Sequence, residues 1–211
     1  MGLITAIYIS IYSLRIPMPF DLSVFKQNLA TYGTASTNKF DVNIGLCPAM
    51  KSLRSDPRFS YLNASQSMIP FRAEASTTPG VGLITTDVNK WGYGPRIKQA
   101  YNTVLSDVRV VLLADSGGDM EQFFMAWMNF IYDFSYSSIP SVAAFTANYR
   151  QDIVSTVTIN KYNRSGSIIN TYNLFEAIPI RYSPISLDWN QTDTNVKLIV
   201  EFAYTSFTLD T

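Results

Sequence analysis

Residues 175–207, FEAIPIRYSPISLDWNQTDTNVKLIVEFAYTSF, contain the clearest strand pattern in the chain. One face of the final segment carries hydrophobic side chains, at Val196, Leu198, Val200, Phe202 and Tyr204. The other face carries Lys197, Glu201 and Thr205, and this period of two is typical of a half-buried β-strand. Before the strand, Pro179 and Pro184 predict an extended arm, and the Asp- and Asn-rich residues 186–195 predict a turn. The stretch therefore predicts the closing strand of a β-barrel or β-sandwich that assembles with copies of itself.

Composition narrows the class of protein. The chain has 211 residues, 47% of them hydrophobic, which fits one folded domain with a proper core. Lys and Arg together equal Asp and Glu at 16 each, so the formal net charge is zero. A neutral chain with 15% charged residues has no electrostatic signature for nucleic acid or an anionic membrane. Its low charge density suits a subunit that neighbours cover.

The residues that usually carry catalysis or bind metals are scarce. The chain has no histidine, and Cys47 is its single cysteine, so histidine-based catalysis, an internal disulfide and a cysteine metal cluster are excluded. The close carboxylate pairs, Asp115 with Asp119 and Asp188 with Asp193, lie where turns and a helix start are expected. We therefore expect no enzyme, no catalytic or metal site and no cofactor.

Residues 1–38 are expected to form an N-terminal arm with a short helix, and residues 39–211 a barrel domain. The apolar residues 1–17 are too short to span a membrane and lack the early positive charge of a secretory signal. They fit either an additional arm or strand, or an upstream start with Met18 as the true first residue. The short helix begins at Asp21, an N-cap, and its apolar face is formed by Leu22, Phe25 and Leu29.

The remaining elements follow from periodicity and turn residues. Strands are predicted at 39–46, 68–76 and 107–115, the last buried on both faces, with a long loop at 47–67. The strongest helix is 119–132, and a second loop covers 134–151. Residues 153–162 and 167–175 form a hairpin around Gly166. The fold class is thus α+β, mainly β: an antiparallel barrel or sandwich with one flanking amphipathic helix.

The long hairpin predicted at 81–101 is the main candidate for an interaction site. Its tip, WGYGP, has two glycines that can adopt positive φ, and Lys90, Trp91, Tyr93 and Arg96 lie at or near it. Exposed aromatic side chains on such a hairpin favour aggregation unless they are covered. The hairpin either folds back on its own barrel or packs on a neighbouring subunit, and we favour the second interpretation.

Several short motifs, in this order, resemble the T-even-type contractile phage tail tube protein family. They begin with Leu22-x-x-Phe25-Lys26-x-Asn28-Leu29 and Phe40-x-Val42, then Thr78-Pro79-Gly80 before the long hairpin. The helix motif Phe124-x-x-Trp127 follows, with a glycine turn at Gly166. The final motifs are Ala177-Ile178-Pro179-Ile180, Leu187-Asp188-Trp189 and the strand ending at Tyr204. The resemblance covers roughly residues 20–207.

The resemblance implies a structural virion protein. Subunits of that family form hexameric rings that pool strands into an inner β-barrel and stack into a tube inside a contractile sheath. The expected partners are identical or related rings, the sheath, the tape measure protein and transiently DNA, with no small-molecule substrate and no membrane insertion. Residues 81–101 would join rings, and Lys197 and Glu201 would face the lumen or the outside. The long loops leave open a baseplate tube initiator, and a monomeric β-sandwich that binds a ligand through WGYG is the rival class.

Overall fold

The computed structural model describes residues 38–89, 92–132, 147–185 and 195–211, and five earlier residues: Leu22, Ser23, Lys26, Gln27 and Ala30. Two units are present, Met1–Ser36 and Thr37–Thr211. The five described residues of the first unit are helical. Residues 1–17, the predicted Asp21 cap, most of the loop predicted at 134–151 and most of the turn predicted at 186–195 lie outside the described residues.

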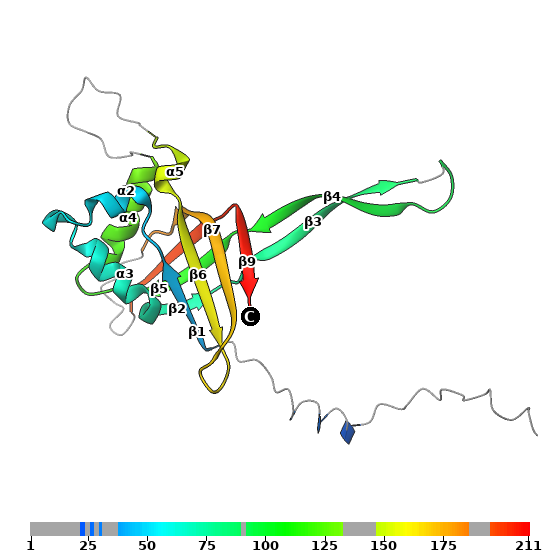
Figure 1. The fold of residues 1–211 in the computed structure, drawn as a ribbon, viewed down its shortest axis with the longest axis horizontal. Helices are drawn as coiled ribbons and strands as arrows, with labels where there is room; N and C mark the ends of the chain where they lie inside the picture. Colours follow the sequence, from blue (N-terminus) through cyan, green and yellow to red (C-terminus); the bar gives the residue numbers. More distant parts are fainter. Residues whose placement is uncertain are drawn as a thin grey trace, which may run out of the picture. The chain divides into compact units, whose positions relative to one another are not determined.

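A seven-stranded antiparallel sheet forms the framework of the second unit (Figure 1). Its strands are β1 (Phe40–Ile44), β2 (Ala73–Ser76), β5 (Val108–Leu113), β6 (Ser155–Tyr162), β7 (Ile168–Tyr182), β8 (Lys197–Ala203) and β9 (Ser206–Asp210). The order is β1-β6-β7-β8-β5-β2, and β9 also pairs with β7. Among the described residues no pairing joins β1 to β2, and a hollow of about 180 Å³ lies beside Phe40 and Thr78 there. The expected antiparallel β fold is confirmed at this level.

Strand β7 belongs to two parts of the sheet because its partner changes along its length. Its first half pairs with β9, from Thr171 to Phe175, and its second half pairs with β8, from Ile178 onward. Strands β8 and β9 follow each other in sequence, so together they pair with β7 along most of its length, from Thr171 to Tyr182. The predicted arm before the closing strand is therefore wrong in part, because residues 175–182 are sheet. Pro179 fits there because the ladder is irregular between Pro179 and Arg181.

Helix α4 (Asp119–Ile131) matches its prediction and provides much of the core. Met120, Phe123, Phe124 and Trp127 are buried, at the spacing of one helix face. The Trp127 ring lies 6.0 Å from that of Phe202 on β8, and its indole N–H donates to the Ile153 carbonyl at 2.9 Å. The predicted alternation of the closing strand is also confirmed, since Leu198, Val200, Phe202 and Tyr204 are buried.

The start of α4 explains the first carboxylate pair. The Asp115 carboxylate accepts the backbone N–H groups of Asp119 and Met120, each at 3.0 Å. Burial opposes the charged form of Asp115, but these hydrogen bonds outweigh it and lower the pKa of the carboxyl group. Asp115 thus satisfies two N–H groups that a helix start leaves unpaired. The predicted position of this carboxylate pair at a helix start is confirmed.

The predicted loop at 47–67 is wrong, and with it the single flanking helix. This segment holds α2 (Pro48–Leu53), a 3-10 turn (Pro57–Phe59) and most of α3 (Tyr61–Arg72). The buried face of α3 is Leu62, Ser65 and Ile69, which has helical spacing but a serine where a hydrophobic residue is expected. Pro70 inside the last turn also resembles a helix break. The strand predicted at 68–76 is consequently reduced to Ala73–Ser76.

Two further differences concern the helices and the middle strand. A short helix, α5 (Arg150–Ile153), precedes β6, and Figure 1 shows α2, α4 and α5 gathered at one end of the strands. Strand β5 is not buried on both faces. Val108, Val110 and Leu112 are fully buried, whereas Arg109 on the other face is exposed. Neighbouring strands cover only the edges of β5, so its second face needs another cover or water. None of the described helices is both long and apolar enough to cross a membrane.

Candidate assembly surfaces

The long hairpin forms a separate two-stranded ribbon. Strand β3 (Gly80–Val88) pairs with β4 (Ile97–Ser106), and neither belongs to the seven-stranded sheet. The register passes from Ile84↔Asn102 to Thr85↔Ala100, which leaves Tyr101 as an extra residue in a bulge. Strand β4 ends at Ser106, so the second strand of the hairpin extends five residues beyond its predicted end at Tyr101.

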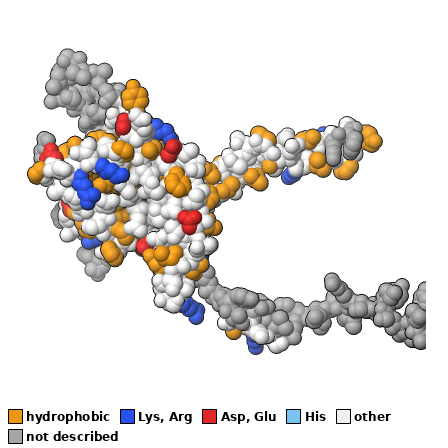
Figure 2. Space-filling model, viewed as in Figure 1, with side chains coloured by type: hydrophobic (Ala, Val, Ile, Leu, Met, Phe, Trp, Pro, Cys, Tyr) orange, Lys and Arg blue, Asp and Glu red, His pale blue; other side chains and the backbone are white. Residues whose placement is uncertain are grey.

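Hydrophobic side chains are exposed on both faces of this ribbon. In the register, Val81 and Leu83 share one face, and Val104 and Ile97 share the other. Leu83 is 63% exposed and Val104 is 50% exposed. Figure 2 shows hydrophobic side chains along the length of the hairpin. A ribbon with two apolar faces cannot bury both against a single subunit surface, and a row of such side chains marks an interaction surface.

The hairpin tip holds the residues that the sequence singled out. Gly92 and Gly94 have φ of 74° and 92°, so the predicted positive φ is confirmed. Tyr93 is 82% exposed, and Arg96 is exposed nearby. Lys90 and Trp91 lie outside the described residues. Their proposed inter-subunit role stays a prediction.

The outward face of β8 carries the other two predicted residues. Lys197 forms an ion pair with Glu74 of β2 at 2.6 Å, and Glu201 forms one with Arg181 of β7 at 3.5 Å. We call this surface, with Arg109 opposite Glu201, the ion-paired face. Exposed pairs of this kind contribute about 0–1 kcal/mol each to stability, so the fold does not depend on them. This face points away from the core and carries both positively and negatively charged side chains.

A second outward surface, on β1, β6, β7 and β9, consists of amides, hydroxyls and two carboxylates. Two rows cross these four strands: Asp41, Asn160, Thr171 and Asp210 in one, and Asn43, Thr158, Asn173 and Thr208 in the other. We call these eight residues the polar face. The sequence analysis missed it. Alternation of Thr and Asn with Val and Ile in β6 gives a weak signal, but only the register shows that the four strands form continuous rows.

Hydrogen bonds connect the polar face from strand to strand. Asn160 donates to Asp41 at 2.8 Å and accepts from the Thr171 hydroxyl at 3.0 Å. Thr158 donates to Asn173 at 3.0 Å, and Asn173 donates to Asp210 at 2.8 Å. The Asp41 carboxylate also accepts the Tyr162 hydroxyl at 2.6 Å. This bond is the main reason that the pKa of Tyr162 is raised. The side chains are therefore held in place by one another.

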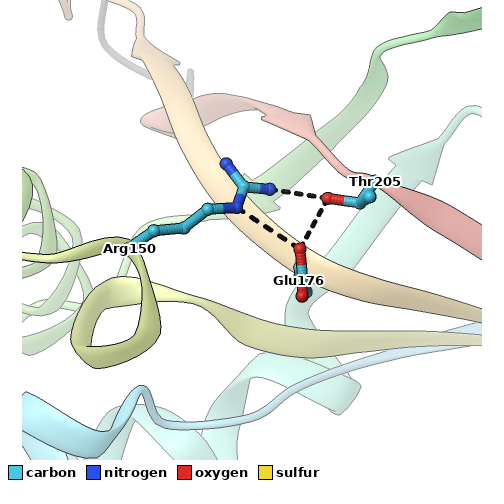
Figure 3. Close-up of polar contacts among 3 residues, drawn as sticks. All are labelled: Arg150, Glu176 and Thr205. Carbon is cyan, nitrogen blue, oxygen red and sulfur yellow. Dashed lines mark hydrogen bonds and ion pairs between the residues drawn. The ribbon is translucent and has the colours of Figure 1, made fainter.

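The bend of β7 is fixed by three residues (Figure 3). Glu176 adopts φ of 52°, a left-handed conformation that is rare for a residue with a side chain. Its carboxylate accepts from the Thr205 hydroxyl at 2.8 Å and from Arg150 Nε at 3.3 Å. Arg150 Nη2 donates to the Thr205 hydroxyl at 2.6 Å. Hydrogen bonds from Thr205, and then from Arg150, lower the pKa of Glu176. We call this group the corner cluster, since it lies where β8 passes into β9.

The described residues contain no group of three or more Cys, His, Asp or Glu side chains placed to hold a metal ion. The sequence model of the phage tail tube protein family matches residues 35–210. The chain belongs to the phage tail tube protein family. A comparison with curated proteins finds no match.

Solved structures agree with this tail tube family membership at the level of the fold. The chain is similar to one in the sheath–tube complex of an extracellular contractile injection system (PVC), extended state. The two are 12% identical over 87% of this chain and 96% of that one, with a TM-score of 0.55. A chain of the anti-feeding prophage baseplate is 11% identical over 83% and 95%, with a TM-score of 0.54. A chain of the tube-terminating cap of that prophage is 12% identical over 84% and 91%, with a TM-score of 0.55. The family match confirms the resemblance in the sequence motifs and supports a structural tail tube role.

Proposed function

We propose that this chain is the repeating subunit of the inner tube of a contractile phage tail. Copies form hexameric rings, the rings stack into a tube, and the tube is a passive conduit for DNA during ejection. In this role the protein belongs to the virion and is assembled in the host cytoplasm. Its partners are identical rings, the sheath outside and the tape measure protein inside. It has no enzymatic activity.

The observation that carries the proposal is the exposed two-faced hairpin. A soluble monomer gains nothing from Val81, Leu83 and Val104 half or more exposed on a ribbon. Burial of such side chains against another copy is favourable by about 25 cal/mol per Å² of apolar area. A ring stack supplies neighbours on both sides of the hairpin, within a ring and between rings, and so covers both faces.

The free edges of the sheet support a ring. Strands β1 and β9 are the outer strands of a four-stranded antiparallel sheet with β6 and β7. Among the described residues, no strand pairs with the outer edge of either one. The four strands alternate in direction, so β9 of one copy beside β1 of the next would continue the alternation. Such head-to-tail contacts form a closed ring when the rotation closes, and they remove exposed strand edges.

Negative-stain electron microscopy of purified protein tests this proposal. We expect rings and stacked tubes, with six-fold symmetry in end views. A protein that stays monomeric at high concentration, with no ring in any condition, contradicts it. Replacement of Trp91 and Tyr93 with alanine distinguishes a tube subunit from the rival class, a monomeric β-sandwich that binds a ligand through WGYG. Loss of stacking supports a tube subunit, whereas loss of small-ligand binding by a monomer supports a β-sandwich binding module.

A baseplate tube initiator of the same fold is the second candidate. The baseplate chain of the anti-feeding prophage has a fold similar to this one, and so does the chain of its cap. An initiator would form one or two ring layers and stop, because only its outer ring would accept another protein. The length distribution of the assemblies therefore distinguishes the two roles. Open-ended growth supports the repeating subunit.

A further inference from the structure

The four strands β1, β6, β7 and β9 have two ends that differ in shape. At one end β6 passes into β7 through the turn at 163–166, and we call this the turn end. The register places Val157 of β6 opposite Ile44 of β1 near the other end. That other end, the groove end, is where β7 bends at Glu176 and where α2 and α5 lie (Figure 1). The two ends are separated by the eight residues of β6, which span about 25 Å.

The turn end carries an exposed projection that is held rigid by hydrogen bonds. The Asn163 N–H donates to the Ser167 carbonyl at 2.9 Å, and the Asn163 side chain accepts the Ser167 N–H at 2.9 Å. The Lys39 ammonium group donates to the Arg164 carbonyl at 2.8 Å, so the chain just before β1 supports the turn. Arg164 itself is exposed. The turn therefore presents a cation in a fixed frame.

A groove of about 520 Å³ opens at the groove end. Strands β6 and β7 and the segment that joins β1 to α2 form its walls. Its apolar lining is Leu46, Pro48, Val154 and Phe175, and its charged lining is Lys51 and Glu176. Phe175 is 40% exposed, although it lies in a strand. An exposed aromatic ring in an apolar groove provides area that another chain can bury favourably.

The carboxylate of Glu176 has an oxygen available in this groove. Its hydrogen bonds from Thr205 and Arg150 both end on Oε2 (Figure 3). A carboxylate has two acceptor oxygens, so Oε1 can accept a further donor, and the side chain is 52% exposed. The groove end thus offers an anion beside an apolar wall. The turn end offers Arg164 and, at the start of β7, Ile168, which is 54% exposed.

We propose that the β6–β7 turn of a copy in one ring docks into the groove of a copy in the next ring. This inference rests on the proposed tube function and names a contact between rings that the sheet itself makes. When β1 of one copy lies beside β9 of the next, the strands run from one flat face of the ring to the other. The turn end and the groove end then belong to opposite faces. Rings that stack in one orientation bring the turn of one copy onto the groove of another.

The exposed side chains of the turn end match the groups in the groove. The apolar Ile168 packs on Phe175, and the Arg164 guanidinium donates to Glu176 Oε1 in a charge-assisted hydrogen bond. Stacking of two turn ends would instead set Arg164 against Arg164 and Lys39 against Lys39. It would also leave Phe175 exposed. Like-charge contacts of this kind select against a wrong partner, so the groove fits the turn of another copy.

Pairs of introduced cysteines test the docking. Ser165→Cys places a thiol on the turn and Thr156→Cys places one in the groove, and both native residues are exposed. The native Cys47 is fully buried, and burial raises the pKa of its thiol, so it reacts little with maleimides. The double variant is assembled into tubes, treated with a short bismaleimide and separated on a denaturing gel. The matched control combines Ser165→Cys with Lys197→Cys on the ion-paired face, and each single variant is treated in the same way.

We expect the double variant to give linked products larger than a hexamer, because links between rings continue along the tube. A mixture of the two single variants should give dimers only. Products that stop at the hexamer would place the contact within a ring, and tubes without links would separate the turn from the groove. Either result overturns the inference, as does equal linkage in the control pair. Failure of the unmodified protein to form tubes would refute the proposed function itself, which is a separate outcome.

A charge variant tests the pairing of Arg164 with Glu176 without a linker. Arg164→Glu places two carboxylates against each other, so the critical concentration for tubes should rise about tenfold or more. Rings should still form on size-exclusion chromatography, and the rise should shrink as salt screens the repulsion. Arg164→Lys keeps the cation and should assemble like the unmodified protein. No rise with Arg164→Glu, or an equal rise with Arg164→Lys, contradicts the contact.

Discussion

Replacement of Leu83 and Val104 with serine should raise the protein concentration at which tubes form, without unfolding the subunit. The two side chains lie on opposite faces of the β3–β4 hairpin, opposite Thr103 and Gly82 across the ribbon. Neither cross-strand partner is a hydrophobic residue, so neither change removes an apolar pair within the hairpin. Substitutions at surface positions of this kind alter the unfolding free energy of a domain by about 0.5 kcal/mol or less.

The expected effect on assembly follows from the exposed fractions. Full burial of a leucine or valine side chain is favourable by about 1.5–3 kcal/mol. Leu83 is 63% exposed and Val104 is 50% exposed, so burial of the remainder is worth about 1.5 and about 1 kcal/mol. Because the two residues face different surfaces, the effects should add to about 2.5 kcal/mol per subunit. That corresponds to a roughly 60-fold rise in the critical concentration.

Sedimentation measures this quantity directly. Tubes are pelleted over a series of protein concentrations, and the concentration left in the supernatant is the critical concentration. Each single variant should show part of the rise, and the double variant should show both parts. Urea denaturation of disassembled subunits checks that the fold is intact.

Two controls make the result specific. Met125 on α4 is 42% exposed, and Met125→Ser removes a comparable apolar side chain from a surface where no contact between copies is proposed. Leu83→Met keeps the apolar character of the hairpin and should assemble like the unmodified protein. If the double variant assembles at the unmodified concentration, or if Met125→Ser has the same effect, the hairpin does not join copies. A rise with only one of the single variants would refute contacts on both faces.

Three further changes test the fold that holds these surfaces. Trp127→Phe removes the N–H group that binds the Ile153 carbonyl and leaves part of the ring volume empty, so the unfolding free energy in urea should fall by about 2–4 kcal/mol. Asp115→Ala leaves two N–H groups at the start of α4 without their acceptor and should cost about 1–2 kcal/mol; an unchanged urea midpoint would contradict the capping role. Glu176→Gln should destabilise the subunit at neutral pH. The pKa of Glu176 is lowered in the folded state, so its contribution is present above the ordinary value of 4.5 and is lost as pH falls through the lower folded value. The urea midpoints of the two proteins should therefore converge in acid, and a difference that persists there would exclude the carboxylate as its source.

The sequence predicted elements whose periodicity is not interrupted. Helix α4 has large hydrophobic residues at Phe123, Phe124 and Trp127, a spacing that fits a helix and not a strand. Strand β8 alternates without a break, which fits a strand and not a helix. Helix α3 was missed because Ser65 occupies a buried position and Pro70 lies in its last turn. With serine at one of the three buried positions, only Leu62 and Ile69 mark the buried face of α3 as apolar. Two hydrophobic residues at helical spacing are too few to distinguish a helix from a loop by periodicity.

The assembly surfaces were predictable only where a single strand or turn defines them. The hairpin tip could be located from its glycines, and Lys197 and Glu201 from alternation in one strand. The polar face could not, because Asn43, Asn173 and Thr208 come from three segments far apart in the chain. Asn and Thr are also common in turns, so their presence in strands gives no separate signal. The pairing register, which tertiary packing determines, is what brings them into rows.

The corner cluster connects the two outward faces. Strand β7 contributes Asn173 to the polar face on one side of Glu176 and Arg181 to the ion-paired face on the other. A regular strand would keep alternating across that point, whereas the left-handed φ of Glu176 changes the direction of the chain. Hydrogen bonds from Thr205 and Arg150 hold this conformation, and Thr205 sits at the matching break between β8 and β9. The corner cluster therefore holds both the bend of β7 at Glu176 and the break between β8 and β9 at Thr205. This allows one sheet to present amides, hydroxyls and two carboxylates in one direction and paired charges of both signs in another.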